Sequence, residues 1–151
     1  MFQLTHTLRD VDDFLHQITQ LGGRFVSKGP ETETYFKSPL HELRVEEGIN
    51  AELVLIKKLD HYHELIEMDI QQPAQMKDLL NQILGERLHL TKQVIRYFVK
   101  DVLIEIHRYN ELGQMLFLQA ETIVQCKDLA RRLGLSDHDR VEKSPAELSG
   151  A

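Results

Sequence analysis

Charged side chains that would share one face of a β-strand recur in four short segments of this chain. They are Glu42, Arg44 and Glu46; Glu67 and Asp69; Lys92 and Arg96; and Glu105 and His107. Carboxylate oxygens are ligands that Mg²⁺ and Mn²⁺ prefer, whereas Lys and Arg suit the oxygens of phosphate groups. These residue types therefore indicate chemistry with a divalent cation, with an anion, or with both.

This alternation has two interpretations. The charged residues form the solvated face of an open antiparallel sheet, or they line the inside of a closed barrel. Inward and outward residues alternate along every barrel strand, so a polar interior gives the same pattern as a solvated face. Periodicity alone does not separate the two.

The elements that carry these residues can be predicted from apolar spacing. Three helices run from about Asp10 to Leu21, from Pro73 to Leu84 and from Thr122 to Leu133, and each ends beside a glycine. Segments with period-two alternation predict strands near 2–8, 23–28, 32–38, 42–47, 52–58, 62–70, 90–99, 101–108 and 115–121. About eight or nine strands with three helices predict an antiparallel α+β domain.

Six phrases of the sequence carry a resemblance to a known family. They are Glu33-Thr34-Tyr35-Phe36, Leu43-Arg44-Val45, Leu55-Ile56-Lys57-Lys58, Leu112-Gly113-Gln114-Met115, Leu133-Gly134-Leu135 and Lys143-Ser144-Pro145-Ala146-Glu147-Leu148. In this order they resemble the CYTH family, which groups class IV adenylyl cyclases with thiamine and inorganic triphosphatases. The resemblance implies an antiparallel β-barrel, or tunnel, of about eight strands with flanking helices. We expect a single domain over residues 1–151, with partial disorder in the polar tail, 136–151.

The resemblance also implies a binding site inside the tunnel. In CYTH proteins basic side chains hold a triphosphate, and carboxylates hold one or two divalent cations. The matching anion-binding positions here are Arg44, Lys57 or Lys58, and Lys92, and the matching metal positions are Glu67 and Asp69. Arg96 forms a basic pair with Lys92 and is a further candidate for anion binding. Only one of Lys57 and Lys58 can point inward, because neighbouring strand residues face opposite ways.

Most of the acidic positions of the family are replaced in this chain. The first strand, where the family carries Glu-x-Glu-x-Lys, has Met1, Gln3 and Thr5 in one register and Phe2, Leu4 and His6 in the neighbouring one, and neither register has a carboxylate. Glu46 stands where the family has an arginine, and His107 stands where it has an aspartate. Losing carboxylate ligands weakens Mg²⁺ binding, because this ion gives up its hydration water reluctantly.

The leading hypothesis is therefore a non-catalytic protein that binds a phosphorylated or other anionic small molecule in a polar tunnel, with no certain cofactor. The alternative is a triphosphatase or class IV adenylyl cyclase that acts on a triphosphate and needs Mg²⁺ or Mn²⁺. A third hypothesis is an interaction protein with a vestigial tunnel, which predicts an apolar surface patch for a partner.

Composition limits the partners and the compartment. A net charge of −6 argues against nucleic acid, and the apolar stretches are too short for a membrane span, which needs about 20 residues. The N-terminal residues lack a signal-peptide pattern, and the single cysteine, Cys126, is predicted to be a buried, unreactive thiol. We expect a cytoplasmic protein, and a homodimer is compatible with base rates. His61 and His63 lie beside a predicted turn, and we interpret them as a solvated loop end rather than a metal site.

Overall fold

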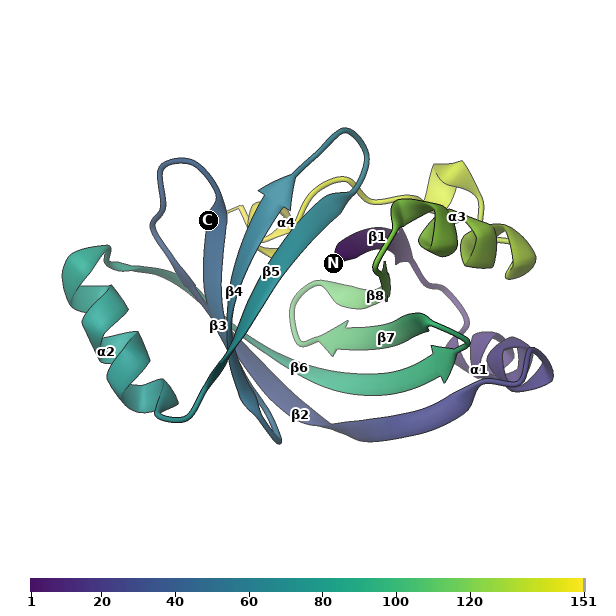
Figure 1. Ribbon diagram of the computed structural model, residues 1–151, viewed down its shortest axis with the longest axis horizontal. Helices are drawn as coiled ribbons and strands as arrows, with labels where there is room; N and C mark the ends of the chain where they lie inside the picture. Colours follow the sequence, from purple (N-terminus) through teal and green to yellow (C-terminus); the bar gives the residue numbers. More distant parts are fainter. Residues whose placement is uncertain (151) are drawn as a thin grey trace.

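The computed structural model describes residues 1–150, in which eight strands close into one barrel (Figure 1). The strands are β1 (Phe2–Thr7), β2 (Arg24–Phe36), β3 (Glu42–Glu47), β4 (Ala51–Lys58), β5 (His63–Ile70), β6 (Glu86–Val99), β7 (Val102–Tyr109) and β8 (Gly113–Ala120). Around the barrel the order is β1-β5-β4-β3-β2-β6-β7-β8, and neighbouring strands are antiparallel. The predicted α+β class and antiparallel tunnel are confirmed.

β2 is one long strand where the sequence analysis predicted two, near 23–28 and 32–38. Gly29 and Pro30 lie in the gap between these two predicted strands, and proline lacks the N–H that a ladder needs. In the structure β6 pairs with β2 along nearly its whole length, whereas β3 pairs only with residues 32–36. Pro30 therefore lies where one edge of β2 has no neighbouring strand, and such an edge tolerates proline.

The three predicted helices are present as α1 (Val11–Gln20), α2 (Pro73–Ile83) and α3 (Ile123–Arg132). The Asp10 side chain caps α1 by accepting from the Asp13 amide at 3.1 Å, and Thr122 with Gln125 forms a capping box at the start of α3. Figure 1 shows α1 and α3 beside the part of the barrel that contains β1, β7 and β8, with α2 on the opposite side.

The tail, for which composition predicts partial disorder, folds onto the barrel in the described residues. A 3₁₀ turn, η1 (Asp137–Asp139), leads into an extended stretch in which the Val141 amide donates to the Thr5 carbonyl at 2.8 Å. Helix α4 (Pro145–Leu148) follows, with a capping box between Ser144 and Glu147 and with Ala146 fully buried. Ser followed three residues later by Glu is the sequence signature of such a cap, so this helix start could have been found.

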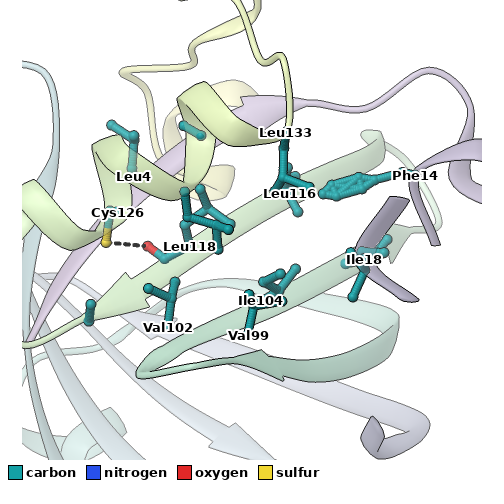
Figure 2. Close-up of a cluster of buried hydrophobic side chains, with 14 residues drawn as sticks. Leu4, Phe14, Ile18, Val99, Val102, Ile104, Leu116, Leu118, Cys126 and Leu133 are labelled. Carbon is teal, nitrogen blue, oxygen red and sulfur yellow. Dashed lines mark hydrogen bonds between the residues drawn. The ribbon is translucent and has the colours of Figure 1, made fainter. Parts of the chain in front are cut away.

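The larger hydrophobic core lies between the barrel wall and the helices α1 and α3 (Figure 2). Ile104 and Ile106 of β7 point outward into it, and the alternate residues Glu105 and His107 belong to the interior. Cys126 of α3 is fully buried here, and its Sγ lies 3.4 Å from the Leu118 carbonyl oxygen (Figure 2). The charged alternation of β3, β6 and β7 is thus the inner face of a barrel, whereas Glu67 and Asp69 of β5 are exposed.

Candidate functional site

The middle of the tunnel is filled by an ion network centred on Lys92 of β6. The Lys92 Nζ donates to Glu33 at 2.6 Å and to Glu46 at 2.7 Å, and lies 3.2 Å from Nδ1 of His107. The side chains of Lys92 and Glu33 have no exposed surface. An ammonium group has three N–H donors, so the groups of the chain itself account for all of them.

Arg44 of β3 joins the same network from the other side. Its guanidinium donates to Glu46 and to the Tyr35 hydroxyl, both at 3.2 Å, and lies 3.7 Å from Glu33. The hydroxyls of Tyr35 and Tyr109 each donate to Glu33, at 3.1 Å and 3.1–3.2 Å. Glu33 is therefore surrounded by hydrogen-bond donors although it is fully buried.

Opposite charges outweigh burial for the two carboxylates and the lysine of this network. Burial by itself would raise the pKa of Glu33, but Lys92 and Arg44 lower it below its usual value. The pKa of Glu46 is lowered for the same reason. Burial would lower the pKa of Lys92, but the two carboxylates raise it. Glu33 and Glu46 are therefore charged at neutral pH, and Lys92 and Arg44 together balance their two negative charges.

A second cluster lies further along the tunnel, around Arg96. The Arg96 Nε donates to Glu105 at 2.5 Å, and Nη2 donates to Glu31 at 2.9 Å. Nε2 of His107 lies 3.0 Å from the other Glu105 oxygen. Burial would raise the pKa of Glu105, but His107 and Arg96 lower it to about 2. Arg96, like Lys92, is held by carboxylates of the chain.

Beyond this cluster the tunnel ends in an acidic cavity of about 390 Å³. Its charged lining consists of Glu31, Glu46, Glu52, Glu67 and Glu105 with Arg96. Glu52 shares a hydrogen bond with Glu67, and this contact together with burial raises the pKa of Glu52 to about 8. Even with that carboxyl protonated at pH 7, this end of the tunnel carries excess negative charge and disfavours phosphate.

The residues predicted to hold a metal do not form a metal centre in this arrangement. Glu67 lines the acidic cavity, whereas Asp69 lines a neighbouring surface hollow beside Glu47 and Pro73. Within residues 1–150, no three His, Cys, Asp or Glu side chains converge as a metal site requires. The first strand contributes Gln3, an amide that accepts a hydrogen bond from Gln119 at 2.7 Å. Glu67 and Asp69 thus line two different hollows, and the first strand brings an amide to the tunnel where the resemblance implies carboxylates.

The opposite end of the tunnel has a mouth of mixed charge. A cavity of about 370 Å³ there is lined by the polar residues Ser38, His41, Glu42, Lys58, His63, Arg87 and Glu147. The Lys58 side chain is about half exposed, at 49%, and its Nζ lies 3.4 Å from Glu147. Glu42 of β3 pairs with Ile56 of β4, and these two residues lie at the end of the strands that borders the mouth. Glu46 pairs with Glu52 at the other end of the same strands, which borders the acidic cavity.

Two buried groups of the mouth have unused hydrogen-bonding capacity. His63 is 4% exposed, and no hydrogen bond joins its ring to another residue of the described chain. Burial, assisted by Lys58, lowers the pKa of His63, so its ring is neutral at pH 7. Ser144 donates to one oxygen of Glu42 at 2.5 Å, and the other oxygen is buried without a partner. Burial raises the pKa of this carboxyl.

The structure separates the predicted anion-binding residues into three places. Arg44 and Lys92 lie in the central network and Arg96 in the second cluster. Lys58 lines the mouth. Val54, Ile56 and Lys58 occupy alternate positions of β4 and therefore share one face, on which Val54 and Ile56 are buried. Lys57 lies between them in sequence and faces the outer wall.

Several residues of the tunnel were not singled out from the sequence. They are Glu31, Glu52, His63 and Arg87, together with Glu33 in the role of a counter-ion. Glu31, Glu33 and Tyr35 occupy alternate positions, so the pattern that revealed the other polar strands was present there too. His63 was interpreted as part of a solvated loop end, but it is the first residue of β5 and is buried.

An eight-stranded antiparallel tunnel with charged side chains inside and helices outside is the CYTH tunnel fold, as the sequence resemblance implied. Among solved structures, the chain is similar to the PH1012 protein from Pyrococcus horikoshii OT3. The two share 22% identity and a TM-score of 0.87 over 97% of this chain and 98% of that chain.

Two further similar structures come from proteins described as cyclases. A putative adenylate cyclase from Vibrio parahaemolyticus has 18% identity and a TM-score of 0.79, over 99% of this chain and 97% of that chain. A putative adenylyl cyclase from Hippeastrum, HpAC1, with a dominant triphosphatase activity, has 12% identity and a TM-score of 0.58, over 89% and 88%. At these identities the likeness shows a shared fold.

No protein-family model matches the chain, and no curated protein matches it. A search of the described residues finds no helix with the length and apolar character needed to cross a membrane.

Proposed function

We propose that this protein is a non-catalytic binder of a small anionic, phosphorylated molecule, and that the ligand sits at the tunnel mouth lined by Lys58, His63 and Arg87. The observation that carries the proposal is the central network: Lys92 donates to Glu33 and Glu46 instead of facing open space. A triphosphate in the middle of the tunnel would have to displace two carboxylates whose pKa values are lowered by that contact.

The mouth is the part of the tunnel where basic groups border a cavity. Lys58 is half exposed and lies at a distance of 3.4 Å from Glu147, a weak contact that a phosphate can replace. His63 offers a neutral ring without a hydrogen-bond partner in the described chain, and a ring N–H can donate to a phosphate oxygen. Glu42, when protonated, adds a hydroxyl donor. Anion binding by Arg44, Lys92 and Arg96 stays a prediction. It requires the carboxylates that now contact these three side chains to move away.

A second candidate is a metal-dependent triphosphatase or adenylyl cyclase, which the descriptions of the similar Vibrio and Hippeastrum proteins favour. It requires Mg²⁺ or Mn²⁺ at Glu67 and Asp69, with a rearrangement that brings a third carboxylate to them. The replacement of the first-strand carboxylates by Met1, Gln3 and Thr5 supports the non-catalytic proposal over this one.

The test uses two adjacent lysines that face opposite ways. Binding of inorganic triphosphate, pyrophosphate and ATP is measured by calorimetry, with and without Mg²⁺ or Mn²⁺, for the wild type, Lys58→Gln and Lys57→Gln. We expect metal-independent binding that Lys58→Gln weakens by about tenfold, since it removes one charge-assisted hydrogen bond. Lys57→Gln makes the same charge change on the outer wall and should leave the affinity unchanged.

Equal weakening by both variants would contradict a specific contact at the mouth. Release of phosphate or pyrophosphate from a triphosphate, abolished by Glu67→Gln, would instead establish the enzyme.

A further inference from the structure

A second cavity with basic side chains lies outside the tunnel, between the outer wall of β1, helix α3 and the C-terminal segment. Its volume is about 380 Å³, within the range of small-molecule sites. Its polar lining consists of His6, His61, Lys127, Arg131, Asp137 and Arg140. These residues come from four separate segments, namely β1, the β4–β5 turn, α3 and the stretch around η1.

Basic side chains gather at this cavity in a protein of net charge −6. Lys127, Arg131 and Arg140 contribute three cations, and Asp137 is the one carboxylate among the lining residues. Lys127 forms no ion pair with any residue between 1 and 150. Arg140 donates to Asp137 at 2.9 Å, but its Nε is buried with no partner. Arg131 also lies 3.5 Å from Asp128, in a pair whose two side chains are both more than half exposed, so Lys127 and the unpaired Nε of Arg140 are the basic groups left for an anion.

Two histidines of the cavity also have unused ring nitrogens. His6 is 1% exposed, and its Nδ1 is buried without a hydrogen-bond partner. Nε2 of His61 is likewise buried and unpaired, while its Nδ1 lies 3.3 Å from Asp60. Burial and Arg140 lower the pKa of His6 to about 4, so at neutral pH its ring is uncharged and carries one N–H donor. Buried polar groups without partners are rare in folded proteins, so their gathering around one cavity points to a ligand.

We infer that this cavity binds a phosphate group, free or carried by a small monoester, through Lys127, Arg131 and Arg140 with the imidazoles of His6 and His61 as further hydrogen-bond partners. Guanidinium groups match the geometry of phosphate oxygens, and an oxyanion accepts hydrogen bonds from several donors at once. The unpaired Nε of Arg140 and the unpaired ring nitrogen of His6 are the kinds of group that such a ligand satisfies. This site is separate from the tunnel and does not depend on the function proposed for it.

The site is tested by NMR of the full chain with ¹⁵N-labelled histidine. Inorganic phosphate is titrated at constant ionic strength with chloride as the compensating anion, and the imidazole nitrogens of His6 and His61 are followed. A small phosphate monoester, phenyl phosphate, is titrated in a parallel series. We expect saturable shifts at both rings. Equal affinity for the two probes assigns free phosphate as the ligand, and tighter binding of the monoester assigns a role to its organic part.

Matched variants separate a built site from general charge attraction. Lys127→Gln should weaken the response by about tenfold, because it removes a charge-assisted contact. Arg132→Gln, on the same helix but outside the cavity lining, should leave it unchanged. Lys58→Gln should also leave it unchanged, which distinguishes this site from the tunnel mouth. Imidazole signals that do not move up to high phosphate concentration, or equal weakening by Lys127→Gln and Arg132→Gln, would overturn the inference.

Discussion

Replacing Lys92 with Met tests whether the centre of the tunnel is an internal ion network rather than a vacant anion site. Met has nearly the length of Lys but no charge, so the change leaves Glu33 and Glu46 without their shared ammonium, at 2.6 and 2.7 Å in the wild type. Because the side chains of Lys92 and Glu33 have no exposed surface, water cannot replace the contact that Glu33 loses, whereas the Glu46 side chain is 17% exposed. Removing one partner of a buried ion pair costs about 3–5 kcal/mol.

That loss is large enough to measure by several methods. For a chain of this length, about 1 kcal/mol corresponds to a Tm change of roughly 2–4 °C, so Lys92→Met should lower the Tm by about 6–20 °C. Urea unfolding followed by circular dichroism gives the free energy of unfolding directly. Lys57→Met, which removes a lysine from the outer wall, is the control and should stay within about 0.5 kcal/mol of the wild type.

The pH dependence of the variant has the opposite sign to that of the wild type. In the wild type the pKa of Glu33 is lowered below its ordinary 4.5, so its stabilising contribution is present above pH 4.5 and is lost as the pH falls below it. Without Lys92, burial dominates and raises this pKa, so Lys92→Met should regain stability as the pH falls. Adding Glu33→Gln should restore much of the loss at pH 7. A Lys92→Met protein as stable as the wild type at pH 7 would refute the reasoning.

Three other predictions concern the acidic cavity and the core. Glu52→Gln should be more stable than the wild type at pH 8 but not at pH 4. The reason is that the pKa of Glu52 is raised to about 8, so the stability of the wild type falls as the pH rises from 4.5 to 8. A series of Tm measurements over this pH range tests the prediction, with Glu121→Gln, at an exposed site, as the control. The Cys126 thiol should react with a disulfide reagent only after unfolding, because burial raises its pKa to about 12; reaction in the native protein would contradict its placement. Leu118→Ala should cost about 2–5 kcal/mol in urea unfolding, whereas Leu79→Ala, at a site 54% exposed, should cost far less; equal costs would contradict the core described.

The predicted strands and helices depended on local patterns, and the errors occurred where a local pattern was misleading. Two strands were predicted in place of β2, because the sequence does not show that β6 pairs across Gly29 and Pro30 while β3 leaves that edge of β2 free. The polar composition of the tail favoured partial disorder. Composition gives no sign that Ala146 packs against the barrel and is buried there.

The phosphate-binding inference had no signal in the sequence at all. His6, His61, Lys127 and Arg140 belong to four separate segments with no common spacing. Their proximity depends on the packing of α3 and on the bridge between His6 and Arg140. Histidines 61 and 63, which lie two residues apart, line two different cavities.

The sequence by itself determined which charged residues of a strand share one face, because the side-chain period of a strand is two and needs no knowledge of the partner strand. It also determined the three main helices, through apolar stripes and their glycine stops. Only the tertiary structure decided what the charges do. Lys92 meets Glu33 and Glu46, which are 59 and 46 residues away, because β3 and β6 both pair with β2 and the barrel closes around them. A lysine in a sequence is a potential phosphate ligand; whether a carboxylate already neutralises it depends on distances that only the closed barrel sets.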